Sequence, residues 1–482
     1  MSQSHPQNAS PESPPRPWET IHSPAGTFTT VREDGVVRAW GLRYAEAERF
    51  EAPRPCRCTG GSTEGDSPEA DSPEAAIPDP PFHAETRAPA CPQRHSPQDT
   101  ELLALGFDEH CQRLSITRPD SEATDLPVLI WLHGGSYVGG AGDLPHYDPR
   151  WLVTEHQIIV VSVTYRLGLF GYLGDGISRE ANPGLLDQAA AVDWVHRNIA
   201  AIGGDPEQIT IAGQSAGGHS CFDLLLIPEL RGKISRAILQ SGPLGIVHGR
   251  SRKVWEALAP AASSTESMRA ASTDQLTEGE SCINRLALRR GTAKFMPFST
   301  RYGARPLPPE EEIAQQWIAN AGHVEILMGT TSREVALFLG AVRPLLRLGR
   351  TRLGRRLVIE PLVSAMTAMI YRRDHVRWHR RYRRAGGQSR LYRFVFGDPQ
   401  QLLSCCHLAE LPLLFPHPVW HHGTEEAGAG VTGPQLMQTY PPEHRDRAGR
   451  ELRAVWGGFI RHGVSAVPAD GIPGVLEVER SC

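Results

Sequence analysis

Hydrophobic residues in this chain occur in short apolar runs separated by stretches with helical spacing. The runs lie at residues 126–132, 158–163, 208–212, 237–240, 324–328 and 391–396, and each predicts a buried strand. Between them, apolar residues at helical spacing predict a helix over Leu185–Ala200, which ends before Gly203-Gly204. Strands that alternate with helices predict an α/β fold. We expect a large, mostly parallel central sheet with helices on both faces and a helical cap region.

Two polar segments interrupt this pattern. Residues 1–20 are rich in Ser, Pro and Asn without an apolar core, so we expect them to be disordered and not to act as a secretory signal. Residues 58–81 contain a tandem repeat of Asp-Ser-Pro-Glu-Ala and are predicted to form a polar insertion. Residues 21–475 are then expected to form a single domain. Because no apolar run is long enough to span a membrane, we expect no membrane insertion and a cytoplasmic location.

Charge excludes one class of partner and marks one unusual segment. A net charge of −4 gives no footprint for nucleic-acid binding. The segment from Arg343 to Arg393 is nevertheless dense in Arg, with only Glu360 and Asp374 as acids. The preferred interpretation is a solvated face of cap helices, and the alternative is a docking surface for anionic lipid or substrate. Lys is nearly absent, which indicates a GC-rich bacterial genome.

The segment Gly213-Gln214-Ser215-Ala216-Gly217 directly follows one predicted strand. A G-x-S-x-G sequence at a strand-to-helix turn is typical of a nucleophile elbow, where small neighbours allow a strained Ser to stand exposed. Ser215 is therefore the candidate nucleophile of a serine hydrolase.

A second glycine-rich motif follows an earlier predicted strand. His133-Gly134-Gly135-Ser136-Tyr137 comes directly after 126–132. In acyl transfer the carbonyl oxygen becomes an oxyanion, and backbone N–H groups reach it closely only where side chains are small. The candidate oxyanion-hole donors are Gly135, Ser136 and Ala216, and the alternative is an ordinary glycine turn between strands.

A nucleophilic Ser requires a base and an acid that orients the base. Predicted strand 324–328 is followed by a turn that ends at Glu334, and strand 391–396 is followed by a segment that contains His407. Spacing alone does not select these two residues among the carboxylates and 20 His of the chain. Cys56-x-Cys58 and Cys405-Cys406-His407 lack the paired spacing of zinc sites, so neither metal nor cofactor is predicted.

These motifs, taken in order, resemble the type B carboxylesterases, a family that also contains the cholinesterases and bacterial p-nitrobenzyl esterases. The resemblance extends from about residue 24 to 470. Its further motifs are Gly41–Glu46, Ala88–Gln93, Thr164–Gly168, Gly184–Gln188, Gly203–Pro206 and Gln240–Gly242.

The resemblance implies an α/β-hydrolase fold and a carboxylic-ester hydrolase. It implies that Glu334, on a G-x-x-x-x-E turn, is the catalytic acid and that His407 is the base. It also implies a buried, structural ion pair between Glu109 and Arg166. Ser241 is expected to be a packed, hydrogen-bonded Ser near the elbow. Leu408 departs from the family, which usually has a small residue after the His.

Cysteine and aromatic content refine the resemblance. Secreted members of the family bridge the positions that match Cys91 and Cys111, whereas a chain without a signal peptide favours free thiols there. Only Phe107 between them is aromatic. Cholinesterases hold a quaternary ammonium on an aromatic ring in this region, so choline esters are not the expected substrate.

The expected ligand is a small-molecule ester, and the oligomeric state is left open. One alternative is a thioesterase or acyltransferase that uses the same triad. Another is a non-catalytic, adhesion-like binding protein, since some members of the family have lost the nucleophile.

Overall fold

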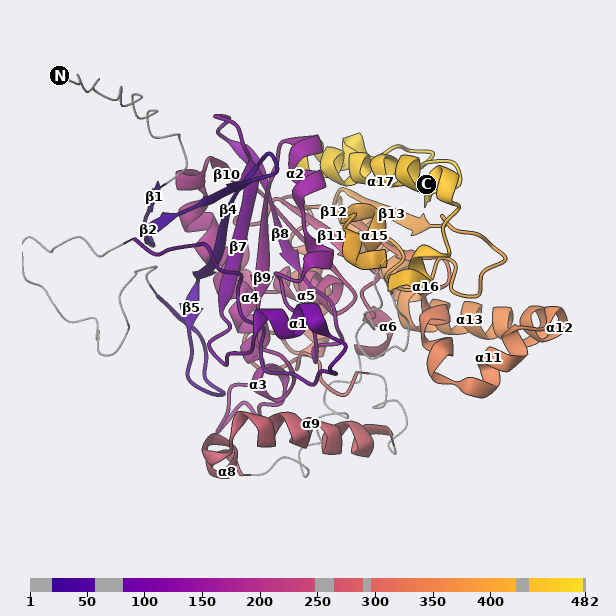
Figure 1. Ribbon diagram of the computed structural model, residues 1–482, viewed down its shortest axis with the longest axis horizontal. Helices are drawn as coiled ribbons and strands as arrows, with labels where there is room; N and C mark the ends of the chain where they lie inside the picture. Colours follow the sequence, from indigo (N-terminus) through magenta and orange to yellow (C-terminus); the bar gives the residue numbers. More distant parts are fainter. Residues whose placement is uncertain (1–19, 57–80, 248–263, 289–295, 422–432, 480–482) are drawn as a thin grey trace, which may run out of the picture.

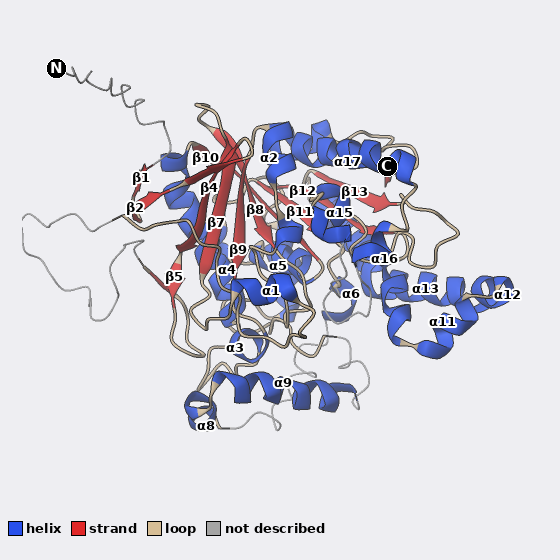
Figure 2. Ribbon diagram, viewed as in Figure 1, coloured by secondary structure: helices blue, strands red, loops and turns tan. Residues whose placement is uncertain are grey.

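The computed structural model describes residues 20–56, 81–247, 264–288, 296–421 and 433–479, and its centre is a twisted sheet of ten strands (Figures 1 and 2). The strand order is β14-β13-β12-β11-β10-β8-β9-β7-β4-β3. Neighbouring strands are parallel from β13 to β9, and antiparallel pairs close both edges. The expected α/β fold with a mostly parallel sheet is confirmed. The strands are β3 (Val31–Glu33), β4 (Val36–Arg43), β7 (Arg113–Pro119), β8 (Leu126–Leu132), β9 (Ile159–Thr164), β10 (Gly204–Gln214), β11 (Arg236–Gln240), β12 (Glu325–Thr331), β13 (Ser389–Phe394) and β14 (Leu476–Val478).

The six predicted strands are all present, with small differences at their ends. The largest difference is in β10, which begins at Gly204, before the predicted Gln208. Gly204 pairs with Leu126, and the register then shifts before Ile209 pairs with Val128. This bulge lengthens the strand without adding to the apolar run, so hydropathy alone did not indicate it. Two short hairpins lie outside the main sheet: β1 (Thr20–Ser23) with β2 (Gly26–Thr29), and β5 (Ala45–Glu46) with β6 (Arg54–Pro55).

The sheet separates two hydrophobic cores. Along β8, Val128, Ile130 and Leu132 face one core, while Leu129 and Trp131 face the other. Side chains alternate in this way because successive residues of a strand point to opposite faces. Both faces are therefore buried, which explains why the central strands are apolar runs without polar alternation.

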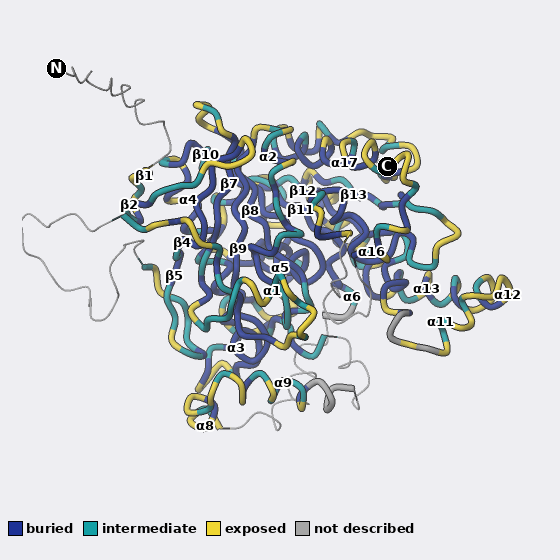
Figure 3. The backbone as a smooth tube through the Cα atoms, in the orientation of Figure 1, coloured by how far each residue is buried: buried dark blue, intermediate teal, exposed yellow. Residues whose placement is uncertain are grey.

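Helices cover both faces of the sheet (Figures 2 and 3). Apolar residues of α4 (Pro183–Asn198) and α5 (Ala216–Leu224) belong to one core, and those of α2 (Arg150–His156) and α17 (Pro442–His462) belong to the other. The predicted helix at Leu185–Ala200 is α4, which continues as a short 3-10 turn, η2 (Ile199–Ile202), to Gly203 at φ 82°. Other helices are α1 (Thr100–Leu105), α3 (Gly168–Tyr172), α6 (Leu244–Val247), α8 (Thr265–Ala270), α9 (Thr273–Leu288), α10 (Ile313–Ile318), α15 (Leu411–Leu414) and α16 (Gly433–Met437).

A helical arm extends from the sheet at one side of the molecule (Figure 1). It follows the 3-10 turn η7 (Glu334–Ala341) and consists of α11 (Arg343–Gly349), α12 (Arg352–Gly354), the π-helical turn η8 (Arg355–Ile359) and α13 (Glu360–Thr367). A second π turn, η9 (Ala368–Arg372), leads into α14 (Arg373–Arg384), which packs against β13 and β12. This arm corresponds to the expected cap region and contains most of the Arg-rich segment.

The predicted Glu109–Arg166 ion pair is wrong. Glu109 pairs with Arg49, and Arg166 pairs with Asp187 of α4, with 2.7 Å between Arg166 Nη2 and Asp187 Oδ1. Arg166 also donates to the main-chain oxygen of Glu51 at 2.8 Å. Arg166 does connect an early loop to the central sheet, as expected, but its acid partner comes from a helix. The expected pair rested on the family resemblance, which did not show that packing of α4 places Asp187 at this guanidinium.

The remaining structural expectations have mixed outcomes. Ser241 is buried as expected, and its N–H donates to Gly329 O at 2.8 Å, but its hydroxyl has no hydrogen-bond partner in the described part of the chain. Cys91 and Cys111 are buried free thiols. No helix within the described ranges is long and apolar enough to cross a membrane. The predicted disorder over 1–20 and the insertion at 58–81 fall almost entirely outside the described residues.

Candidate active site

Ser215 lies at the turn between β10 and α5. Its backbone has φ 58° and ψ −119°, a region that residues with a side chain rarely adopt, and its N–H donates to Gln240 O at 2.9 Å. The glycines of the motif explain how the turn fits: a Cβ on Gly217 would lie 2.0 Å from Leu132 O. The structure therefore gives Ser215 the strained backbone of a nucleophile elbow.

The loop after β8 is equally strained. Gly135, Ser136 and Tyr137 have φ of 104°, 55° and 62°. A Cβ on Gly135 would lie 1.9 Å from Gly139 O, so this position excludes any other residue. His133, at the start of the loop, stacks on Tyr165 with ring centroids 4.4 Å apart. Burial lowers the pKa of His133 to about 4, so this His is neutral at ordinary pH.

The loop and the elbow are in direct contact. A Cβ on Gly134 would lie 3.2 Å from the Cβ of Ser215 and 2.9 Å from Gln214 O. Within the described ranges, the N–H groups of Gly135, Ser136 and Ala216 donate to no protein acceptor. Unpaired N–H groups beside a strained Ser are what an oxyanion hole requires. The three expected donors thus lie on two segments that meet at Ser215.

His407 and Glu334 form a buried pair across 73 residues of sequence. His407 Nδ1 lies 2.6 Å from Glu334 Oε2, and the N–H of His407 donates to Glu334 O at 3.1 Å. The second oxygen of the carboxylate, Oε1, accepts from the N–H of Thr331 at 2.7 Å. The contacts with His407 and Thr331 hold the carboxylate in place. Because Nδ1 of His407 carries the proton that Glu334 accepts, Nε2 of the ring is unprotonated and can accept a hydrogen bond.

The acceptor Nε2 of His407 is occupied by Gln214. Its partner is Gln214 Nε2, at 3.1 Å, and Ser215 Oγ makes no hydrogen bond with any described residue. Gln214 immediately precedes Ser215, so a small rotation of its side chain frees the imidazole. Catalytic contacts of this kind often form only when substrate is bound. Sequence reasoning gave Gln214 no role, although its place inside the motif was a signal.

Aromatic side chains pack near the imidazole ring of His407. Ring centroids of Tyr371 and Phe338 lie 5.2 and 6.2 Å from that of His407. Phe338 is 42% exposed, while Tyr371 packs with Val335 and Ile370 in a small apolar cluster. Burial, and secondarily the charge of Glu334, raises the pKa of the Tyr371 hydroxyl. These residues match no sequence motif, so the sequence did not indicate an apolar wall here.

A second buried polar network lies behind the elbow. Tyr137 OH is 2.6 Å from His219 Nδ1, and His219 Nε2 is 3.2 Å from Tyr302 OH, which donates to Asp223 at 2.6 Å. Burial lowers the pKa of His219 to about 3 and raises that of Asp223 to about 7. The spacing of His219 four residues after Ser215 places it one turn along α5, which was the available signal.

Leu408 and Glu410, which follow His407, have an unusual backbone conformation and an unusual pKa, respectively. Leu408 has φ 75°, a backbone region that favours Gly, which explains why a small residue is usual there. Glu410 is fully buried, and burial, together with the negative charge of Glu334, raises its pKa to about 8. When Glu410 is neutral, Glu334 is the charged carboxylate that interacts with the imidazole of His407.

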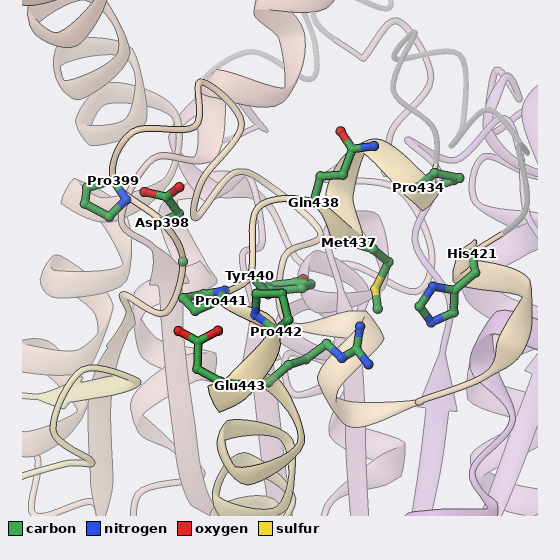
Figure 4. A pocket seen from close by; sticks show the side chains of 12 residues that line it. Asp398, Pro399, His421, Pro434, Met437, Gln438, Tyr440, Pro441, Pro442 and Glu443 are labelled. Atoms are coloured by element: carbon green, nitrogen blue, oxygen red, sulfur yellow. The ribbon is translucent and has the colours of Figure 1, made fainter.

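A large cavity lies elsewhere in the described structure, away from this site. It encloses about 750 Å³ beside the start of α17 and is lined by residues that include Asp398, His421, Tyr440 and Glu443 (Figure 4). None of Ser215, Glu334 and His407 lines it. Its rim reaches His421, next to residues 422–432, which lie outside the described ranges. We therefore assign the candidate chemistry to the elbow and not to this cavity.

Known proteins with a similar sequence or fold are esterases and other hydrolases. Residues 33–353 match the model of the Carboxylesterase family. A probable N-octanoylanthranilate hydrolase from Rhodococcus erythropolis is 32% identical over 464 residues, which cover 94% of this chain and 95% of that protein. The para-nitrobenzyl esterase of Bacillus subtilis is 33% identical over 345 residues, covering 65% and 62%. A crystal structure of a Geobacillus stearothermophilus carboxylesterase has a TM-score of 0.72 and 25% identity, covering 96% of this chain and 97% of that one.

Proposed function

The chain belongs to the carboxylesterase family and is a carboxylic-ester hydrolase, and on that basis we propose that Ser215, His407 and Glu334 carry out the reaction. The observation that carries the proposal is the contact between three strained or buried elements: the elbow, the glycine loop and the Glu334–His407 pair. They follow four strands of the same sheet: the loop follows β8, the elbow follows β10, Glu334 follows β12 and His407 follows β13.

The proposed cycle has two halves. Ser215 Oγ attacks the ester carbonyl while His407 Nε2, released from Gln214, accepts the hydroxyl proton. Glu334 stabilises the imidazolium, and the N–H groups of Gly135, Ser136 and Ala216 bind the oxyanion. The alcohol leaves with the proton from His407, which leaves an acyl group on Ser215. Water, activated by His407, then releases the acid. No step requires a cofactor.

The surroundings of His407 support an apolar acyl group as substrate. Phe338, Tyr371 and the partly buried Met366 form a hydrocarbon surface beside the imidazole. The name of the Rhodococcus relative includes an octanoyl group. We therefore choose p-nitrophenyl octanoate as the first ester to test, with the acetate for comparison.

Labelling with a fluorophosphonate tests the nucleophile. The probe should modify Ser215 alone, because only there do a base and oxyanion donors converge. Peptide mapping should place the adduct between Ile211 and Arg231, and Ser215→Ala should abolish labelling and ester turnover. Ser241→Ala is the matched control, and we expect it to keep both. A folded protein with neither adduct nor turnover would favour an adhesion-like binding protein, and labelling without ester turnover would favour thioester hydrolysis or acyl transfer.

Substitution of the pair tests the base and acid. His407→Ala and Glu334→Gln should each lower ester turnover by orders of magnitude. The double variant should be little worse than His407→Ala, since the two residues act as one unit. If the two losses multiply in the double variant, the acid that orients His407 is a carboxylate other than Glu334.

For cellular location we propose the cytoplasm. The supporting observation is the buried pair Cys91 and Cys111, whose thiols are free. Burial, followed by hydrogen bonding to Cys91, raises the pKa of Cys111 well above its usual value, so the thiol form is favoured. Free buried thiols are usual in a reducing compartment. Mass mapping of alkylated protein from cells would show a bridged pair if the location were oxidising.

A further inference from the structure

The end of the helical arm has an unusual surface composition. We define the hairpin tip as residues 347–358, which comprise the end of α11, α12 and most of η8. Figure 1 shows α12 at the far end of the arm, away from the central sheet, and Figure 3 shows the same region largely exposed. A surface at the end of an arm can meet a large partner without obstruction by the rest of the molecule.

Large apolar side chains of the tip are exposed. Leu353 is 70% exposed, Leu357 is 63% exposed and Val358 is 42% exposed. Leu353 lies in α12 and Leu357 lies four residues later in the π-helical turn η8, so the two side chains are about one helical turn apart. By contrast, the next residues along the helix, such as Ile359 and Val363, are buried in the core. Exposed leucines at a protruding tip are a feature that a solvated helix face does not require.

Arginines without partners flank these leucines. Arg347, Arg350, Arg352 and Arg356 are exposed, and none of their guanidinium groups makes an ion pair or hydrogen bond with another described residue. Arg352 and Arg356 repeat at the same four-residue spacing as Leu353 and Leu357, one position earlier. The tip therefore has an apolar side with a basic side next to it. This arrangement is typical of helices that lie in the interface of an anionic membrane.

Hydrogen bonds and ion pairs hold the hairpin tip in a defined conformation. Thr351 Oγ1 accepts from the N–H of Gly354 at 3.1 Å, which caps α12. Arg355 points inward, where it pairs with Glu360 at 3.0 Å and donates to Gln400 O at 2.6 Å. Glu360 also pairs with Arg333, the residue before Glu334. The leucines are therefore presented by an ordered turn whose root lies next to the candidate acid.

We propose that the hairpin tip binds the surface of a lipid bilayer that contains anionic lipids. The arginines complement the phosphate and carboxylate groups of such a surface, and the leucines insert among the acyl chains. A symmetric contact with a second copy is disfavoured because it would place the four arginines against their own counterparts. Nucleic acid would satisfy the arginines but would leave the leucines in water. Docking would also bring an ester dissolved in the bilayer near Glu334 and His407, a consequence that rests on the proposed function.

Vesicle sedimentation tests the proposal. Full-length protein is mixed with extruded vesicles of phosphatidylcholine alone or with about one quarter phosphatidylglycerol, at low and high NaCl. We expect binding to the anionic vesicles that weakens as salt rises. The pairs Leu353→Ser/Leu357→Ser and Arg352→Gln/Arg356→Gln should each lower the partition coefficient roughly tenfold or more.

Matched controls lie elsewhere on the surface. Ile177→Ser removes a more exposed apolar side chain, and Arg54→Gln/Arg197→Gln removes two exposed arginines, so both should bind as the unchanged protein does. Thermal unfolding confirms that each variant is folded, and this check does not depend on esterase activity. The proposal fails if phosphatidylglycerol does not increase binding, or if tip variants bind as the controls do. It also fails if light scattering shows a dimer that the leucine substitutions dissociate, which would make the tip a contact between copies.

Discussion

At the scale of single residues, the oxyanion loop and the nucleophile helix are held together by a buried hydrogen bond. Tyr137 directly follows Ser136 in a strained loop, and its hydroxyl lies 2.6 Å from Nδ1 of His219 on α5. Ser220 Oγ donates to the same hydroxyl at 3.3 Å. Because Ala216 begins α5, this contact sets how far the loop donors lie from the Ala216 N–H.

Tyr137→Phe should therefore lower kcat while leaving KM nearly unchanged. The substitution keeps the ring against Tyr172 but removes the bond to His219, so the two halves of the oxyanion hole can separate. Oxyanion donors act on the transition state, and a loss of about 10- to 100-fold in kcat is expected from weakened donor geometry. Steady-state kinetics with p-nitrophenyl esters measures it.

Tyr302→Phe is the matched control for this prediction. Tyr302 contacts the opposite nitrogen of His219 and makes a hydrogen bond to Asp223, so its loss disturbs the same network without releasing the loop. We expect its kcat to stay within about threefold of the unchanged protein. Equal effects of the two substitutions, or a change in KM alone, would mean that the network is only structural.

At the scale of elements, one buried ion pair joins the sheet, a helix and an early loop. Arg166 follows β9, Asp187 lies in α4, and the main-chain oxygens of Glu48 and Glu51 accept from the same guanidinium. Both charged side chains are buried. The pair between Arg49 and Glu109 is nearer the surface, with both side chains about one fifth exposed. The two pairs therefore differ mainly in burial.

Asp187→Asn should destabilise the protein far more than Glu109→Gln. Loss of one partner leaves the Arg166 charge buried without compensation, which costs about 3–5 kcal/mol, whereas a more exposed pair contributes about 1 kcal/mol or less. Urea unfolding of the two variants measures the difference. Similar midpoints for both would show that water or another carboxylate compensates Arg166.

At the scale of the whole molecule, stability depends on ionisable groups buried between the layers. Glu280 of α9 is one of them, and its Oε1 accepts from the N–H of Leu169 in α3 at 2.7 Å. Burial is the main cause that raises the pKa of Glu280 to about 7 from an ordinary value of 4.5. The buried side chains of His133 and His219 have lowered pKa values for the same reason.

The raised pKa of Glu280 predicts a pH window for stability. A carboxyl with a higher pKa in the folded state binds its proton more tightly there, so stability falls as pH rises from about 4.5 to 7 and is then constant. Glu280→Gln keeps the acceptor for Leu169 but has no charge to desolvate. Its unfolding free energy should exceed that of the unchanged protein by a margin that grows across this window to about 1–3 kcal/mol.

The control is Glu278→Gln, an exposed position on the same helix. Its difference from the unchanged protein should stay near zero at every pH. The buried histidines are present in all three proteins, and they lower the unfolding free energy only as pH falls. Their contribution is therefore the same in each protein and cancels when the variants are compared with the unchanged protein. A margin for Glu280→Gln that does not change between pH 5 and 8 would contradict the prediction.

Much of this protein can be inferred from its sequence because the relevant signals are local. Apolar runs located the central strands, since both faces of a parallel sheet are buried. The glycines around Ser215 and Gly135 marked two strained turns, because a turn that excludes a Cβ restricts its own sequence. Glu334 and His407 required the family resemblance, since nothing local separates a catalytic His from the others.

Contacts between distant segments were decided only by the tertiary structure. Arg166 pairs with Asp187 because packing of α4 brings that carboxylate to it, and the Tyr137–His219 bond exists because the loop after β8 lies against α5. The same holds for Gln214 at His407 and for the leucines of the hairpin tip. Hydropathy shows that a leucine is apolar, but only the position of the arm shows that no other part of the described chain covers it.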